Sequence, residues 1–143
     1  ALAENNIEVN LDYVCVDLDD KYNMLNETEA ARYDSLRAYI AEIIGQMRAE
    51  GVTCILCQND WVAVELYSVC EELGISVPDD MCIMGFDNMD ELNNMHGGDK
   101  IITVEQDFYE IGVRAGETIL KEIRGEEKGI RDVVPVKLIT RDY

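Results

Sequence analysis

A chain of 143 residues, of which 48% are hydrophobic, is long enough for one domain with its own core and too apolar to be disordered. Its net charge of −18, from 12 basic and 30 acidic residues, argues against a surface that grips nucleic-acid phosphates, because that affinity depends on cationic contacts. No apolar run approaches the roughly 20 residues that span a bilayer, so no membrane partner is expected, and the acidity fits a soluble cytoplasmic protein. The chain starts at Ala1 in the middle of a pattern, so we expect a piece of a longer protein.

The first residues predict a helix end, a short strand and an acidic loop. Residues 1–6 have the composition of a helix tail, and Tyr13–Val16 is an apolar run typical of a strand. The loop Asp17–Asn23 carries three carboxylates that could hold a divalent cation. It lacks the glycine and glutamate spacing of an EF-hand, so we favour a solvated loop or one that lines a ligand cleft.

Residues 27–50 predict a long amphipathic helix, because apolar side chains recur at spacings of three and four. Asn26 or Thr28 would cap its start, and Gly51 would end it. We expect the apolar stripe to belong to the core.

The stretch Thr53–Trp61 predicts a strand that stops at polar residues and runs directly into a helix. Residues 54–57 are all apolar, the mark of a strand covered on both faces. Asn59 and Asp60 follow at its carboxyl end, where open α/β sheets hold ligands, although Asp60 would also serve as a helix N-cap. The helix over residues 61–73 is apolar on more than one side, so we expect it to contact the sheet and a second surface.

A second strand, over residues 81–86, also stops at polar residues, Asp87 and Asn88. Because the carboxyl ends of parallel strands share one edge of a sheet, we expect both polar pairs to lie together as a site for a small polar ligand. The segment Asp90–Asp99 follows, and we interpret its single histidine, His96, as a surface-loop residue.

The C-terminal third predicts two more strands around a helix. Residues 101–105 form a short strand that ends at Gln106, and Asp107 would cap a helix over residues 108–124. Residues 133–141 predict a last strand, with Pro135 at its start or on a sheet edge.

Five cysteines raise the question of redox or zinc chemistry, especially Cys54-x-x-Cys57. A strand points residues three apart to opposite faces, so these two thiols should diverge. We therefore expect buried, reduced, structural thiols, which also fits the cytoplasm, and no metal site. The five are Cys15, Cys54, Cys57, Cys70 and Cys82.

Four segments in this order, with these gaps, resemble the LacI/GalR family of bacterial transcription repressors in their effector-binding domain. Residues 57–60 (CQND) resemble the family's strand–Asn–Asp–helix segment, and residues 72–80 (ELGISVPDD) its turn before the next strand. Residues 83–88 (IMGFDN) resemble its V-x-G-F-D strand, and residues 102–106 (ITVEQ) its L-T-T-V-x-Q segment. Gly112, Ala115 and Gly125 also fall where the family has a helix and its closing glycine.

The resemblance implies an α/β fold: a three-layer parallel-sheet lobe of the periplasmic-binding-protein-like type I fold, truncated at its N-terminus. Residues 1–143 would be mostly the C-terminal lobe, with the N-terminal lobe and a DNA-binding headpiece preceding Ala1. It further implies a sugar-like effector bound by Asn59, with Asp60 beside it, and by Asp87 and Gln106, while Tyr22 is our candidate for a ring stacked on the sugar. It implies a homodimer and operator DNA bound only through the headpiece. The helix over residues 61–73 is our candidate dimer contact, and a charge at Tyr67 or Val69 should weaken self-association.

Two other classes of protein share parts of this pattern. A sugar-binding protein of an ABC-type transporter has the same fold, and a signal peptide upstream would distinguish it. A Rossmann-like enzyme would need a phosphate loop or an activated nucleophile, and the sequence contains no G-x-S-x-G, P-loop or G-x-G-x-x-G motif. We therefore expect neither catalysis nor a cofactor.

Overall fold

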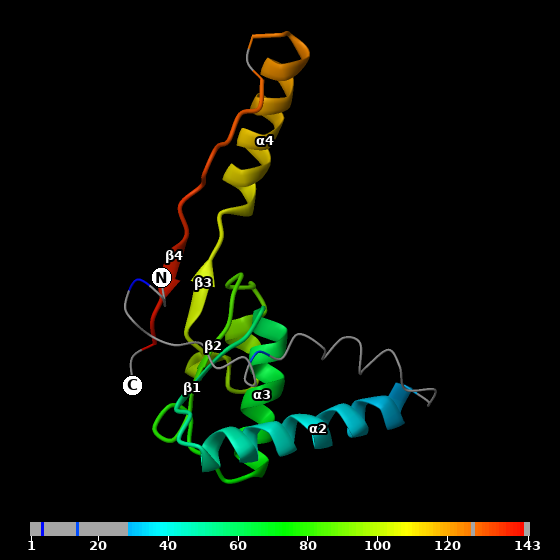
Figure 1. Ribbon diagram of the computed structural model, residues 1–143, viewed down its shortest axis with the longest axis vertical. Coiled ribbons are helices and arrows are strands. Elements are labelled where there is room, and N and C mark those ends of the chain that lie inside the picture. The colour runs from blue at the N-terminus through cyan, green and yellow to red at the C-terminus, as the bar shows by residue number, and fades with distance from the viewer. Residues whose placement is uncertain (1–3, 5–13, 15–28, 127, 142–143) are drawn as a thin grey trace.

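The computed structural model describes residues 4, 14, 29–126 and 128–141. Helices α2 (Glu29–Ala49) and α3 (Asp60–Glu72) pack with short strands into a body, and helix α4 (Phe108–Ile123) extends away from it (Figure 1). Of the expected strand at 13–16 only Val14 is described, and it is exposed; the loop at 17–23, with Tyr22, and the two candidate caps of α2 lie outside the described residues.

The strands form two two-stranded sheets, one parallel and one antiparallel, which isolated parallel bridges connect. Strand β1 (Cys54–Leu56) pairs in parallel with β2 (Cys82–Met84), and two parallel bridges, Met84 to Ile102 and Asp87 to Glu105, join β2 to β3 (Thr103–Glu105). The predicted α/β fold with parallel strands is therefore confirmed. Strand β4 (Lys137–Ile139) is antiparallel to β3, because the chain returns beside α4 and enters the sheet from the opposite direction (Figure 1).

The three predicted helices are confirmed to within two residues at each described end. Gly51 (φ 84°) follows α2 and Gly74 (φ 68°) follows α3. Both have left-handed backbones that glycine adopts without steric cost, which explains why each helix ends there. Helix α4 begins where Asp107 accepts a hydrogen bond from the backbone N–H of Glu110 at 2.8 Å, as predicted.

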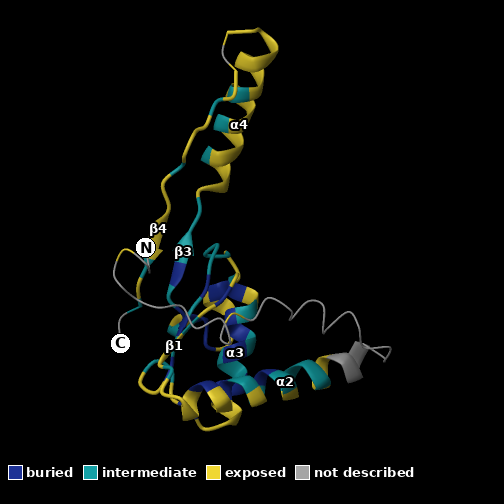
Figure 2. Cartoon of the chain, viewed as in Figure 1, coloured by how far each residue is buried: buried dark blue, intermediate teal, exposed yellow. Residues whose placement is uncertain are grey.

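The core lies on one face of the sheet. Ile40 and Ile44 of α2 share one buried cluster with Val69 of α3 and Ile83 of β2, so both helices cover the same face (Figure 2). The prediction that residues 54–57 are buried on both faces is wrong, since Cys54 and Leu56 are exposed. The part of the chain that the structure describes places no element over that side of β1.

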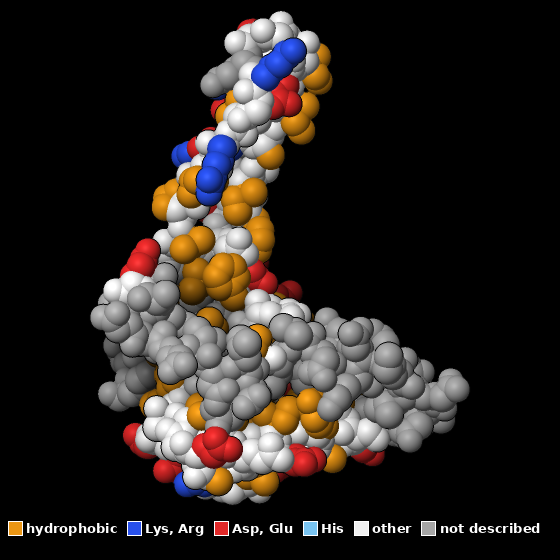
Figure 3. All heavy atoms as spheres, in the orientation of Figure 1, with side chains coloured by type: hydrophobic (Ala, Val, Ile, Leu, Met, Phe, Trp, Pro, Cys, Tyr) orange, Lys and Arg blue, Asp and Glu red, His pale blue; other side chains and the backbone are white. Residues whose placement is uncertain are grey.

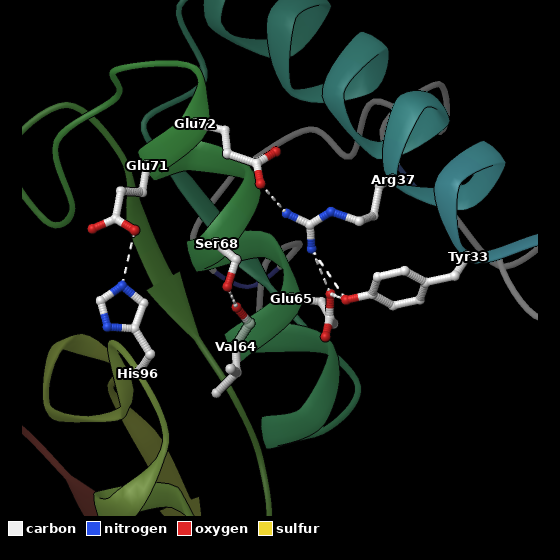
Figure 4. Close-up of polar contacts among 8 residues, drawn as sticks. All are labelled: Tyr33, Arg37, Val64, Glu65, Ser68, Glu71, Glu72 and His96. Atoms are coloured by element: carbon white, nitrogen blue, oxygen red, sulfur yellow. Dashed lines mark hydrogen bonds and ion pairs between the residues drawn. The ribbon is translucent and has the colours of Figure 1, made fainter. Parts of the chain in front are cut away.

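Helices α2 and α3 are also joined by one guanidinium group. Arg37 of α2 donates to Glu65 and to Glu72 of α3, both at 2.8 Å, and Tyr33 donates to the same Glu65 oxygen at 2.6 Å (Figure 4). The Arg37 side chain is 18% exposed, so the contact is shielded from water on its α2 side. These hydrogen bonds hold α2 and α3 together where the two helices cross on the covered face of the sheet.

The cysteines are free thiols at all four described positions. Cys54 and Cys57 point to opposite faces of β1, as predicted, because Cys54 is exposed and Cys57 is 6% exposed. Burial raises the pKa of Cys57 to about 12 and that of Cys70 to about 11. The expectation that Cys54 is buried is wrong, although partial desolvation and the neighbouring Cys82 still raise the pKa of Cys54 to about 11. Among the described residues, no group of three or more His, Cys, Asp or Glu could hold a metal ion.

Helix α4 and the segment 128–136 that returns beside it form a projection that we call the arm. Arg114 holds the two together by donating to Asp132 at 3.2 Å. No residue of α4 is buried, and its apolar side chains lie open along the arm (Figures 2 and 3). The most exposed are Tyr109 (82%), Ile123 (76%) and Phe108 (61%). Across the described ranges, no helix is both long enough and apolar enough to traverse a bilayer.

Candidate functional site

Three chain segments end side by side at the carboxyl edge of the parallel strands. Asn59 and Asp60 follow β1, Asp87 and Asn88 follow β2, and Gln106 follows β3. The bridge between Asp87 and Glu105 shows that the last two segments are direct neighbours. The structure therefore brings together the described residues that the sequence predicted for one site.

Asp87 and Gln106 form a hydrogen-bonded pair at this edge. The Gln106 side-chain amide donates to one carboxylate oxygen of Asp87 at 2.6 Å, and both residues are half-buried. The backbone N–H of Asp87 donates to the carbonyl of Val104 at 2.9 Å, which ties the loop to β3. Among the described residues, no hydrogen bond reaches the second carboxylate oxygen of Asp87.

Asn59 has two roles in this arrangement. Its side-chain oxygen accepts from the backbone N–H of Val62 at 3.0 Å, which makes Asn59 the N-cap of α3. The prediction that Asp60 is the cap is wrong, because the extended residue that precedes the helix is Asn59 (φ −155°) and Asp60 is already helical. Among the described residues, the side-chain amide N–H groups of Asn59 make no hydrogen bond.

Asp60 lies beneath the site and not in it. It is fully buried; one carboxylate oxygen accepts from the Thr103 hydroxyl at 2.6 Å and the other from the backbone N–H of Met89 at 2.9 Å. The prediction that Asp60 contacts a ligand is corrected accordingly, since protein donors occupy both oxygens. Sequence reasoning missed Thr103, whose signal was a hydroxyl inside an otherwise apolar strand.

His96 lies far from this edge. It is exposed, as predicted, and contacts Glu71 at 2.8 Å (Figure 4). Its ring also meets the ring of Tyr67 edge-on, with 5.6 Å between the ring centroids. Glu71 belongs to the last turn of α3 and Asn59 precedes the first, so the helix rise alone separates them by roughly 18 Å. His96 is thus not part of the site.

The chemistry of the site is that of a hydroxyl-binding edge. A carboxylate accepts hydrogen bonds at two oxygens, and a carboxamide both donates and accepts, so Asp87, Gln106 and Asn59 together match the donor and acceptor capacity of vicinal hydroxyls. Polar groups that a bound ligand shields from water discriminate strongly, because a ligand that lacks the matching hydroxyl leaves them unpaired.

Comparison with known proteins places this chain in a family. Residues 15–142 match the periplasmic binding protein-like domain. The chain is 27% identical over 143 residues to the HTH-type transcriptional repressor PurR of Photobacterium profundum, an alignment that covers 99% of this chain and 38% of that protein. The chain thus spans about a third of the length of the curated relatives it matches.

Solved structures agree with the sequence comparison. The Lac repressor bound to ONPG in its repressed state superimposes with a TM-score of 0.58 at 26% identity, over 67% of this chain and 29% of that one. A LacI family transcriptional regulator from Enterococcus faecium with bound ribose gives a TM-score of 0.57 at 28% identity, over 73% of this chain and 39% of that one. The chain belongs to the periplasmic-binding-protein-like domain family and, within it, to the effector-binding domains of LacI/GalR transcriptional regulators.

Proposed function

We propose that this chain is the ligand-sensing part of a bacterial transcriptional repressor and that it binds a small sugar-like effector without catalysing a reaction. The observation that carries the proposal is the hydrogen-bonded pair of Asp87 and Gln106, which lies beside Asn59 where three strand ends meet. Ribose bound to the Enterococcus faecium relative supports a carbohydrate as the class of effector. Tyr22 is retained as the proposed stacking ring.

The arm supports the proposal that the working protein contains a second lobe. Ile119, Leu120 and Ile123 are each at least half exposed on α4, and Val133 is 67% exposed on the returning segment. An apolar helix side of this kind is normally buried against another element. The relatives are about three times as long as this chain, so the proposed protein has further chain that could cover it. In the proposed protein, the remaining lobe covers the arm, and the effector lies in the cleft between the two lobes.

The proposed mechanism is allosteric. An effector that hydrogen-bonds both lobes favours the closed arrangement by its difference in affinity for the open and closed forms. The lobe arrangement would set the spacing of a DNA-binding headpiece in each half of a homodimer, so effector binding and operator binding are coupled.

The dimer contact that we propose within this chain stays on helix α3, but it shifts from Tyr67 and Val69 to another residue of that helix. Val69 is 1% exposed and belongs to the core, and Tyr67 is half-buried beside His96. Trp61, which is 55% exposed at the start of the same helix, is the apolar side chain that we propose for self-association.

The test uses the full-length protein that contains this chain and a panel of pentoses and disaccharides that includes ribose and lactose. We expect one sugar to bind by calorimetry and to change operator affinity. Asp87→Ala should weaken that sugar at least tenfold, because removing a charged hydrogen-bond acceptor costs about 1.5–3 kcal/mol. The matched control is Asp90→Ala, which removes an exposed carboxylate three residues away and should leave binding unchanged.

Two outcomes decide between the readings. Asp87→Ala binding the sugar as tightly as the wild type would remove this edge from the site. A sugar that binds tightly but leaves operator affinity unchanged would favour the transport protein over the repressor.

A further inference from the structure

The buried carboxylate of Asp60 joins the three strand ends from below. It belongs to α3, accepts from Thr103 of β3 at 2.6 Å and accepts from the backbone of Met89, in the loop after β2, at 2.9 Å. Its own backbone N–H donates to the carbonyl of Phe86 at 3.0 Å. Asp60 and Thr103 are both fully buried, so no ligand reaches these groups in this structure.

The loop held by this pair has an uncommon backbone. Asp87 (φ 100°) and Asn88 (φ 49°) are consecutive non-glycine residues with positive φ, a region that L-residues seldom occupy unless the surrounding structure imposes it. The backbone N–H of Asn88 donates to the Thr103 hydroxyl at 3.3 Å, and the next N–H, of Met89, donates to Asp60. Two successive amides of the loop are thus anchored by the buried pair.

Gly85 shows how closely the pair is fitted to β2. A Cβ built on Gly85 would overlap the Asp60 oxygen that Thr103 bonds, and it would lie 3.2 Å from the Asp60 Cα. Only a residue without a side chain allows the carboxylate to lie this close to the strand. Strand, helix and loop therefore meet at one carboxylate.

We propose that Asp60 and Thr103 are positioning residues for the effector site. They act through the backbone of residues 87–89 and hold the loop in the left-handed conformation that aims the Asp87 carboxylate at Gln106. Asp87 and Gln106 contact the effector in this scheme, so the role in effector binding rests on the proposed function. The hydrogen bonds that hold the loop do not depend on it.

The test reads the loop directly and needs no effector. In amide NMR spectra of the full chain, Thr103→Val removes the hydroxyl with little change in shape, and Thr103→Ser restores it. We expect Thr103→Val to move the backbone signals of Asp87, Asn88 and Met89 and the side-chain amide signals of Gln106, and Thr103→Ser to return them. Hydrogen exchange at the Met89 amide should be at least tenfold faster in Thr103→Val than in the wild type.

A core substitution separates positioning from general destabilisation. Ile44 is 1% exposed in α2 and has no contact with the loop through the hydrogen bonds above, so Ile44→Val should lower stability while the loop and Gln106 signals stay in place. If Thr103→Val fails to fold, Asp60→Asn serves instead, because it keeps one acceptor oxygen and should release either Thr103 or Met89.

The inference is overturned if the Met89 amide of the wild type exchanges as fast as an exposed loop amide. It is also overturned if Ile44→Val moves the loop signals as much as Thr103→Val does. Both measurements are free of ligand, so a protein that binds no sugar but shows the Thr103 effect would refute the proposed function and leave the positioning role standing.

Discussion

Replacing Gly85 by alanine should destabilise the chain strongly, although it adds a single methyl group. The new Cβ would overlap an oxygen of Asp60 and lie 3.3 Å from its Cγ. The carboxylate cannot move aside freely, because it is fully buried and holds Thr103 at 2.6 Å and the Met89 amide at 2.9 Å. Relief of the overlap therefore requires loss of a hydrogen bond or displacement of β2.

The expected loss of stability follows from two costs, that of the broken hydrogen bond and that of the overpacked interior. Breaking a hydrogen bond to a charged group costs about 1.5–3 kcal/mol, and overpacking a tight interior costs about 1–3 kcal/mol. Their sum, about 2.5–6 kcal/mol, is a large part of the total stability of a small domain, which is about 5–15 kcal/mol. In urea unfolding followed by circular dichroism, the midpoint should fall by about 2 M, given a slope near 2 kcal/mol per M.

The same chemical change at Gly45 is the matched control. Gly45 lies in α2, and nothing stands within 4 Å of the position of its Cβ. Gly45→Ala should therefore leave stability unchanged or raise it by up to about 1 kcal/mol through helix propensity. A Gly85→Ala variant that unfolds at the same urea concentration as the wild type would refute the reasoning about Asp60.

Three further predictions concern the body of the molecule. Arg37→Met should cost about 1 kcal/mol in urea unfolding, an effect that shrinks at high salt because Glu65 is 41% exposed; an equal loss in molar salt would contradict the ionic explanation. The hydrogen bond that Tyr33 donates to Glu65 raises the pKa of Tyr33 above 10.0, so its contribution to stability is complete below pH 10 and is lost as pH rises through the raised pKa. Glu65→Ala should lower that pKa in an ultraviolet titration of the phenolate, and an unchanged curve would count against the bond. A variant that keeps Cys57 as its only cysteine should react with a thiol reagent at pH 8 much more slowly when folded than when unfolded, because burial, the largest cause of the shift, still raises the pKa of Cys57 above 9.0; equal rates would show that the thiol is accessible.

The helices and their ends were predictable because their signals are local. Apolar spacing of three and four marks α2, and glycine at 51 and 74 marks positions where the backbone turns left-handed. The polar ends of β1, β2 and β3 were predictable for the same reason, since each follows an apolar run within a few residues. Their meeting at one edge followed from the parallel pairing that alternating strands and helices impose.

Asp60 and Asp87 show which structural features cannot be predicted from local sequence signals. Each is a carboxylate that follows a strand, so the local sequence pattern does not distinguish the two residues. Thr103 lies 43 residues from Asp60 along the chain, and its contact turns Asp60 into a buried support while Asp87 remains at the edge. Whether a carboxylate faces a ligand or the interior depends on which distant group packs against it, and periodicity carries no information about that.

The sequence by itself therefore determined the α/β character of the chain, the course of its helices and the polar edge at which Asn59, Asp87 and Gln106 meet. Tertiary structure decided the burial of Asp60, the exposure of Cys54, the direction of β4 and the projection of the arm. The physical reason is the range of the interactions involved. Helix and turn preferences act over a few residues, whereas burial, strand direction and packing depend on contacts between residues far apart in the chain.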